Sequence, residues 1–473
     1  MTSGTSEVPA HIPKARRLTL MALTSVIFGT ACGGPFGLEA LVGSVGPGWA
    51  FVLILVTPVL WALPTSLAVA ELAGLMPEEG GYYVWVRETL GPFWGLQEAW
   101  WTLGYSIVLM AIYPVLFVNY LTYLVPPLGS ASDAPGSWQG SVTRWVLAVL
   151  VIVSATAVNW RGAKAVGRYA QLSMALVLGA FAVLVLIALG HPGALHAATS
   201  AITGSLDPKR RGALLVGLSV VIFNYSGWDN ASTFAGEVDE PRRNYSRALG
   251  LALAATVLVY VLPVLAGLSA TTDAAAWSAE AGWPVIARSV GGPWMGSMLA
   301  AAGLVATWSL FSNSLLYVSR LPYVMACDGW LPHGMATASG ESAVPKVALA
   351  WSCVITSVFA AVSFGNLVVM YVLLYGLALT LEFLALLVLR RRKPEAERSF
   401  TVPGGWLGIA YVCMAPLGVA AAVMVASLRE EESHAGQFLV VAGVIASGVA
   451  LYLARRSQVR LLGSGPKDRE AQR

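Results

Sequence analysis

Long apolar segments dominate this chain and constrain its fold more than any other feature. Twelve can be marked, at about 18–43, 49–73, 93–125, 143–160, 166–190, 212–236, 247–270, 294–326, 346–363, 366–389, 404–427 and 436–454. A helix needs about 20 mainly apolar residues to cross a bilayer. The segments are continuous, whereas the strands of an outer-membrane barrel are short and alternate in hydrophobicity. The sequence therefore predicts an all-α integral membrane protein with twelve transmembrane helices.

The scarcity of charge supports the same class. Of the 473 residues, 57% are hydrophobic and 11% are charged, while a soluble protein carries about 25% charged residues. This composition excludes a soluble enzyme, a secreted disulfide scaffold and a disordered chain. The four cysteines lack metal-ligand spacing, and the sequence contains no P-loop, zinc motif or nucleophile elbow. We therefore expect no metal, no cofactor and no enzymatic activity.

The basic residues are distributed unevenly between the two sides of the membrane. If the first segment begins inside, 23 of the Lys and Arg residues fall on the cytoplasmic side and 6 on the other. Because cytoplasmic loops are enriched in Lys and Arg, both terminal tails (1–17 and 455–473) are predicted to be cytoplasmic. The Lys and Arg residues lie in loops between apolar segments, so they do not indicate a nucleic-acid partner. The partner expected beside them is membrane lipid. The lack of organellar or partner signals suggests a bacterial inner membrane.

Two of the segments are interrupted in the middle. The first contains Gly33-Gly34-Pro35-Phe36-Gly37, and the sixth contains Asn224-Tyr225-Ser226-Gly227-Trp228-Asp229. The segments of 18–190 and 212–389 then correspond as two sets of five. Because five is odd, the second set enters the membrane from the opposite side, which is the pattern of an inverted repeat with broken helices. Segments 11 and 12 (404–454) are predicted to be accessory.

The first interruption has a chemical interpretation. Glycine adopts backbone angles that other residues avoid, and proline suits the first turn of the helix that resumes. Free N–H groups at a half-helix N-terminus attract an anion such as a carboxylate. Carbonyl groups freed at both breaks would attract an ammonium group. The alternative is a kink that serves packing alone.

At this point the chain resembles the amino acid–polyamine–organocation superfamily of permeases over nearly its whole length. Its plant-type polyamine uptake branch, next to the L-type amino acid transporters, looks closest. The stretches that carry the resemblance are 29–37, 70–72, 77–83, 90–95, 113–117, 223–229, 235–238, 319–320 and 328–332.

The resemblance implies a five-plus-five inverted repeat that works by alternating access. Gly33 and Gly34 would donate backbone hydrogen bonds to a substrate carboxylate. Phe223 would close over the substrate as an aromatic lid. The substrate-binding residues expected on these grounds are Cys32, Gly33, Gly34, Phe36, Gly37, Phe223, Asn224, Ser226, Trp228 and Asp229.

The chain also departs from the pattern of its relatives. Several permeases of the superfamily carry a lysine in span 5, where residues 174–178 here contain none. Polyamine permeases carry carboxylates where Ala40, Leu109 and Ser312 stand, which argues against a polycation as substrate. The loop 129–143 has no cysteine, so no disulfide-linked heavy chain is expected.

Ionisable groups at membrane depth are functional candidates because burying them is costly. Asp229 either interacts with a cation or caps the resuming half-helix. Glu98 and Glu382 are interpreted as snorkelling or locally paired, and Glu71 as joined to polar groups of spans 6 and 8. The coupling or gating candidates are Glu39, Glu71, Glu237, Arg320 and Ser312, with Glu237 and Arg320 as an inner-gate ion pair.

Three functions remain open at this stage. The leading hypothesis is a secondary amino acid transporter that works by alternating access, coupled to protons or by exchange. The second is a permease for polyamines or other cationic amines with the same architecture. The third is a membrane receptor that does not transport, which would lack uptake in proteoliposomes.

Overall fold

The computed structural model describes residues 19–76, 81–130, 138–161, 163–206, 211–230, 241–337, 345–396, 398, 400–429 and 435–463. Within these ranges the regular structure is entirely helical, with no strand. Nine helical stretches of the described chain are long and apolar enough to cross a membrane. The protein is therefore a multi-pass membrane protein, as its apolar segments predict.

The helices follow one another along the chain with short connections. The first half contains α1 (Leu20–Ala31), α2 (Leu38–Val45), α3 (Pro47–Thr57), the π-helical turn η2 (Pro58–Ala62), α4 (Leu63–Leu75), α5 (Gly81–Leu90), α6 (Pro92–Leu124), α7 (Pro126–Ser130), α8 (Trp138–Asn159), α9 (Ala163–Leu189) and α10 (Ala194–Gly204). The second half contains α11 (Arg211–Asn224), α12 (Pro241–Ala270), α13 (Ala274–Trp277), α14 (Gly282–Gly291), α15 (Pro293–Val318), α16 (Arg320–Cys327), the 3₁₀ turn η5 (His333–Ala336), α17 (Lys346–Phe359), α18 (Phe364–Arg392), α19 (Gly405–Arg429) and α20 (Ala435–Gly463).

The nine long stretches correspond to nine of the twelve predicted segments. The other three predicted segments contain shorter helices: α1 with α2, α11, and the 14-residue α17. Two of these three are the segments with glycine-rich interruptions. The count of twelve spans, the inverted repeat and the division at 190, 212, 389 and 404 stay predictions.

Both interruptions break the helix where the sequence places glycine. α1 ends at Ala31, and Gly34 and Gly37 then adopt φ angles of 92° and 94° before α2 begins. α11 ends at Asn224, and Gly227 follows with φ of 95°. A side chain rarely tolerates such angles, so glycine is required for these turns.

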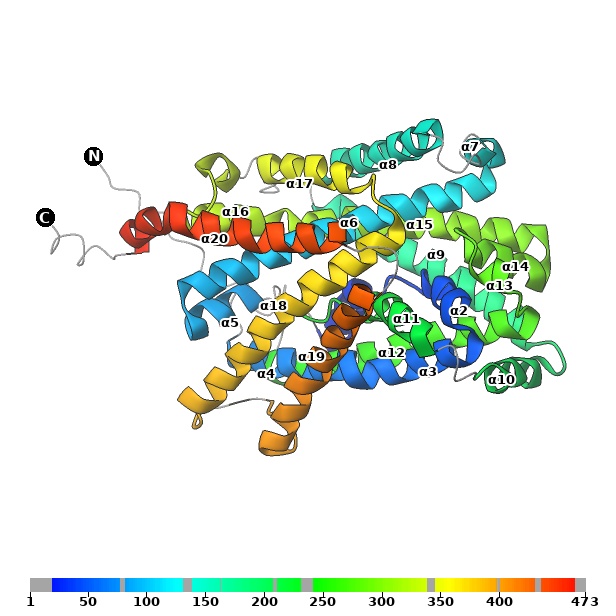
Figure 1. Cartoon of the computed structure of the whole chain (residues 1–473), viewed down its shortest axis with the longest axis horizontal. Coiled ribbons are helices and arrows are strands. Elements are labelled where there is room, and N and C mark those ends of the chain that lie inside the picture. The colour runs from blue at the N-terminus through cyan, green and yellow to red at the C-terminus, as the bar shows by residue number, and fades with distance from the viewer. Residues whose placement is uncertain are drawn as a thin grey trace, which may run out of the picture.

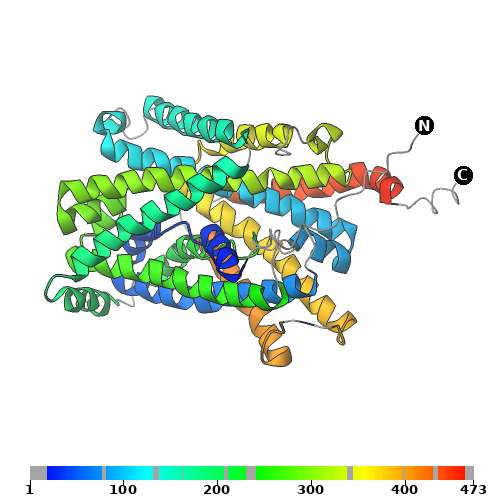
Figure 2. The ribbon, with the colours of Figure 1, turned by 180° about the vertical axis from the view of Figure 1, so that it is seen from behind.

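The two breaks meet inside the molecule. Figure 1 shows the short helices α2 and α11 side by side among the long spans, and they are in contact. In the view from behind (Figure 2), the dark blue α1 runs next to the green α12. A Cβ atom added to Gly37 would lie 3.5 Å from Asn224 Nδ2 and 4.0 Å from the Phe223 ring. The irregular backbone is thus buried in protein, as the bilayer requires.

Candidate substrate site

A small cavity lies between the two helix breaks. Its volume is about 50 Å³, enough for a few water molecules but far below the roughly 300 Å³ of a typical ligand pocket. The structure therefore shows this site in a contracted form. The lining residues are Ala31, Gly33, Gly34, Phe36, Leu109, Tyr113, Leu116, Phe223, Asn224, Ser226, Gly227, Asn230, Tyr260, Thr307, Leu310 and Tyr371.

Six of the ten expected substrate-binding residues line this cavity. They are Gly33, Gly34, Phe36, Phe223, Asn224 and Ser226. Cys32, Trp228 and Asp229 are fully buried and do not line it, and Gly37 borders a wider space instead. No pattern in the sequence singled out Tyr260 and Tyr371, because each lies in a long apolar helix that also contains another tyrosine.

A wider vestibule of about 690 Å³ lies on one side of the cavity. Leu116 lines both spaces. Phe223 stands at the boundary, because its ring lies 6.2 Å from that of Phe364 in the vestibule and 5.8 Å from that of Tyr371 in the cavity. This position suits the aromatic lid implied by the family resemblance.

Glu39 occupies the N-terminus of the half-helix α2. It is 3% exposed, and its Oε2 accepts a hydrogen bond of 2.7 Å from the backbone N–H of Gly37. Its Oε1 accepts a second bond, of 3.2 Å, from the Tyr120 hydroxyl. The chain's own carboxylate therefore fills part of the place where a substrate carboxylate was expected.

On the other side of the cavity lies a layer of three tyrosines, Tyr105, Tyr371 and Tyr375. The Tyr371 and Tyr375 rings stack at 5.5 Å, and Tyr105 meets Tyr375 edge-on at 5.0 Å. Asp229 lies behind this layer and accepts hydrogen bonds from Tyr375 (2.5 Å) and Tyr105 (3.1 Å). Because phenol donors stabilise a carboxylate, the tyrosine layer fixes Asp229 close to the second break.

The π-helical turn η2 supports the second break from the side. It places Trp61 so that the indole N–H donates to Ser226 Oγ at 3.2 Å. The Trp61 ring also packs 6.0 Å from that of Tyr375. Such turns often occur at functional sites, but no pattern in the sequence distinguishes this one from a regular helix.

The structure contradicts the interpretation of Glu98 and Glu382 as snorkelling; local pairing is found for one oxygen of Glu98 and not for Glu382. Their exposed fractions are 0% and 1%. Glu98 Oε1 accepts a bond of 3.3 Å from Thr102, but Glu98 Oε2 and both Glu382 oxygens have no hydrogen-bond partner in the described chain. Long-range packing covers both side chains, and sequence position within a helix does not reveal such cover.

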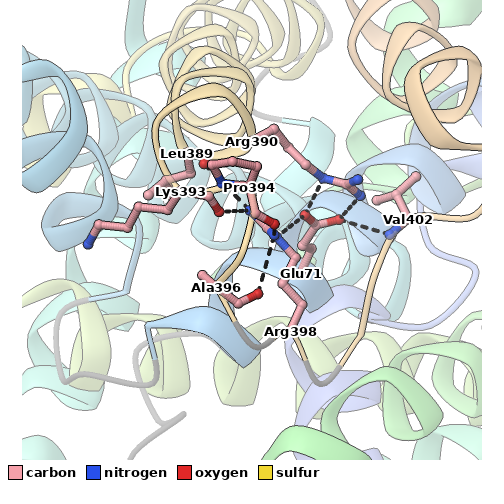
Figure 3. Close-up of polar contacts among 8 residues, drawn as sticks. All are labelled: Glu71, Leu389, Arg390, Lys393, Pro394, Ala396, Arg398 and Val402. Atoms are coloured by element: carbon pink, nitrogen blue, oxygen red, sulfur yellow. Dashed lines mark hydrogen bonds and ion pairs between the residues drawn. The ribbon is translucent and has the colours of Figure 1, made fainter.

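Glu71 has different partners from those expected in spans 6 and 8. Arg390, at the end of α18, binds both Glu71 oxygens at 2.5 Å, and Arg398 lies 3.2 Å from Oε1. The backbone N–H of Val402 donates a further bond of 2.8 Å. Figure 3 shows the two guanidinium groups converging on Glu71, while the Lys393 side chain points away. Glu71 thus joins α4 to the connection between α18 and α19.

The remaining gating candidates lie away from the cavity or outside the described residues. Ser312 is buried against α8, where Asn159 donates to its hydroxyl at 2.9 Å. Glu237 lies outside the described residues. Arg320 is exposed and forms no ion pair with another described residue.

A second polar contact joins α5 to the C-terminal end of α16. The Tyr83 hydroxyl donates to Asp328, and Arg87 lies 3.4 Å from the same carboxylate. Burial raises the pKa of Tyr83, and the Asp328 carboxylate raises it further. The phenol therefore stays a hydrogen-bond donor in the physiological pH range.

A cavity between two broken helices, enclosed by membrane-spanning helices, is typical of membrane transporters. The family model for amino acid permeases matches residues 18–448. The chain therefore belongs to the amino acid permease family and is a transporter.

Three curated relatives are similar over most of their length. A probable polyamine transporter of Arabidopsis thaliana is 31% identical, covering 90% of this chain and 83% of the relative. Polyamine transporter RMV1 of Arabidopsis thaliana is 32% identical, covering 89% and 83%. Polyamine transporter PUT1 of Oryza sativa subsp. japonica is 32% identical, covering 93% and 79%.

Proposed function

We propose that this transporter carries polyamines or similar cationic amines that lack a carboxylate, by alternating access. The observation that carries the proposal is the position of Glu39 on the Gly37 N–H. The bare N-terminus of a half-helix repels a cation and attracts an anion. With Glu39 bound there, this end of α2 is already neutralised, so a cation in the cavity no longer meets an uncompensated positive end.

The cavity lining suits the same substrates. Phe36, Tyr113, Phe223, Tyr260 and Tyr371 surround it with aromatic rings. Aromatic faces attract ammonium groups, and the rings provide apolar surface for methylene chains. A polyamine consists of these two parts only. The names of the three plant relatives point to the same class.

The amino acid alternative rests on the family model and on the backbone groups at both breaks. In that case a substrate carboxylate would bind near Gly33 and Gly34, and its ammonium group near the carbonyls that end α11. Coupling by proton symport or by exchange is open for both substrates. The two substrates differ in the effect of Glu39. It would favour the binding of a cationic amine, whereas it would compete with the carboxylate of an amino acid.

A ligand screen separates the two. Purified protein is heated with putrescine, spermidine, a neutral amino acid or a basic amino acid, because a ligand of the folded state raises its apparent stability. We expect the two amines to raise the melting temperature and to be taken up by proteoliposomes. A response to amino acids without a response to amines would contradict the proposal.

The variant Glu39→Gln sharpens this screen. It keeps an oxygen for the Gly37 N–H but removes the charge, so the end of α2 regains part of its positive character. We expect amine affinity to fall by roughly fivefold, the scale of a helix-terminus interaction. If the site instead binds a substrate carboxylate, the same variant should bind the amino acid more tightly than wild type.

We also propose that both termini and the connection after α18 are cytoplasmic, as the basic residues indicate. The vestibule then faces outward. Residues 141 and 395 are both exposed and lie at the vestibule and in that connection, respectively. The three relatives above are plant proteins and lend no support to a bacterial inner membrane.

Cysteine labelling tests this orientation. In a Cys327→Ser background, an impermeant maleimide applied to intact cells should label Ser141→Cys and miss Glu395→Cys. Both should react once the membrane is permeabilised. The reverse pattern would place the vestibule inside and overturn the assignment.

A further inference from the structure

Three acidic side chains, Glu98, Asp229 and Glu382, form a buried cluster behind the tyrosine layer. Their exposed fractions are 0%, 0% and 1%. They come from α6, from the second break and from α18, and they lie close enough for their charges to interact. None of its members lines the cavity, and the substrate site described above uses neither Glu98 nor Glu382.

The long helices α6 and α18 pass the acidic cluster, the cavity and the vestibule in turn, so their sequences give the order of these three regions across the protein. On α6 the sequence runs from Glu98 through Tyr105 and the cavity residue Leu109 to Asn119 in the vestibule. On α18 the chain runs in the opposite direction, from Phe364 in the vestibule through Tyr371 in the cavity to Glu382. Eleven residues separate Glu98 from Leu109, which is about 16 Å of helix. The acidic cluster therefore lies on the side of the cavity opposite the vestibule.

No basic side chain of the described residues neutralises the cluster. The ion pairs of the described chain lie elsewhere. The other titratable groups that interact with the cluster are the tyrosine layer and Tyr245 of α12, with Tyr82 of α5 acting on Tyr105. The Tyr245 hydroxyl is unsatisfied like the oxygens of Glu98 and Glu382, because its residue is 1% exposed and the hydroxyl has no hydrogen-bond partner among the described residues.

The burial of these groups decides what can neutralise them. An unpaired buried charge costs several kcal/mol, so the three carboxyl groups cannot all be ionised here. A side chain with an exposed fraction of 0% or 1% leaves no room for a water molecule beside it. An ammonium group is of similar size and does not fit either. A proton, in contrast, binds to a carboxylate oxygen without a cavity beside it.

The hydrogen bonds indicate which members are expected to hold protons. Asp229 accepts bonds from two phenols, which stabilise a charged carboxylate. The oxygens without partners belong to Glu98 and Glu382. Protons therefore belong on these two glutamates, while Asp229 carries the negative charge of the cluster.

Resting on the proposed function, we propose that Glu98 and Glu382 form a proton site that exchanges its proton for the cationic substrate. A cation in the cavity acts on the cluster across the tyrosine layer, since Tyr371 lines the cavity and stacks on Tyr375, which contacts Asp229. The added positive charge favours loss of a proton. In that step one carboxylic O–H bond breaks, the proton passes to water when alternating access opens the cluster to solvent, and the ammonium groups of the substrate keep theirs. By linkage, proton and amine weaken each other's binding.

Infrared spectroscopy tests the proton site without any substrate. Purified protein in lipid nanodiscs at neutral pH should show the C=O band of protonated carboxyl groups. Glu98→Gln and Glu382→Gln should each reduce this band, and the double variant should lose most of it. Glu395→Gln is the matched control, because Glu395 is exposed and outside the cluster. An equal band in wild type and the double variant would overturn the proposal.

Proton release on ligand binding tests the exchange. Putrescine added to wild type in weak buffer should release about one proton for each molecule bound, while the double variant should still bind putrescine and release close to none. Putrescine bound by wild type without proton release would overturn the exchange, even if the infrared band is present.

The two proposals fail in different ways. If putrescine and spermidine do not bind but an amino acid does, the proposed substrate is wrong. The proton site is then judged with that amino acid. A release that wild type shows and the double variant lacks supports the site, whereas equal release in both overturns it.

Discussion

Replacing Asp229 with asparagine is expected to weaken diamine binding by about tenfold or more, the scale of a lost charge-assisted interaction. Asp229 is fully buried and holds its carboxylate against Tyr375 and Tyr105, close to Gly227 and Asn230 of the cavity wall. In this low-dielectric setting its charge acts on a cation in the cavity with little screening. Equilibrium binding of putrescine measures the loss.

Two comparisons identify the cause of that loss. Asp229→Asn keeps the shape and hydrogen-bonding capacity of the side chain, so the protein should still fold and elute as wild type. Asp273→Asn is the matched control, since Asp273 is an exposed N-cap of α13 and asparagine caps a helix as well as aspartate. Unchanged putrescine affinity in Asp229→Asn would show that the carboxylate only supports the break.

The sequence predicted those features that depend on short stretches of chain. Nine long spans follow from hydropathy alone, because a bilayer accepts only apolar helices of sufficient length. The two breaks follow from Gly34, Gly37 and Gly227, whose positive φ angles only glycine adopts readily. Six cavity residues follow from the positions of these breaks together with the family resemblance.

The partners of the buried carboxylates could not be predicted in this way. Glu71 and Arg390 are 319 positions apart, and no local pattern relates them. Glu98 lies near the start of α6, where a helix end in the headgroup region would allow snorkelling. Whether it is covered depends on how α5, α18 and α20 pack against α6. The rotation of α18 about its axis likewise depends on tertiary packing and not on local sequence. It places Tyr371, Tyr375 and Glu382 on one buried side.

The interpretation of the first break changed for a related reason. A half-helix N-terminus predicts an anion site, and it holds one here. The anion is the side chain of Glu39, two residues beyond Gly37. Sequence alone leaves open whether this carboxylate turns back to the break or outward to the vestibule. The turn back removes the repulsion that a bare half-helix N-terminus would exert on a polycation.

The second large effect is expected at Glu71. Glu71→Gln should lower the free energy of unfolding by about 3 kcal/mol or more, the usual cost of breaking a buried ion pair from one side. The Glu71 side chain is 1% exposed, and those of Arg390 and Arg398 are 15% and 8% exposed. Two guanidinium groups would be left without a carboxylate. Thermal unfolding in detergent measures the loss.

Charge-matched variants separate this structural role from proton coupling. Lys393→Gln removes one positive charge from the same segment but leaves Glu71 untouched, because its side chain points away from the carboxylate (Figure 3). It should unfold as wild type does. In Glu71→Gln with Arg390→Gln, one unpaired charge is removed again, so part of the stability should return. If Glu71→Gln instead keeps full stability and loses only transport driven by a pH gradient, Glu71 carries protons and the ion pairs with Arg390 and Arg398 are not what holds α4 to the end of α18.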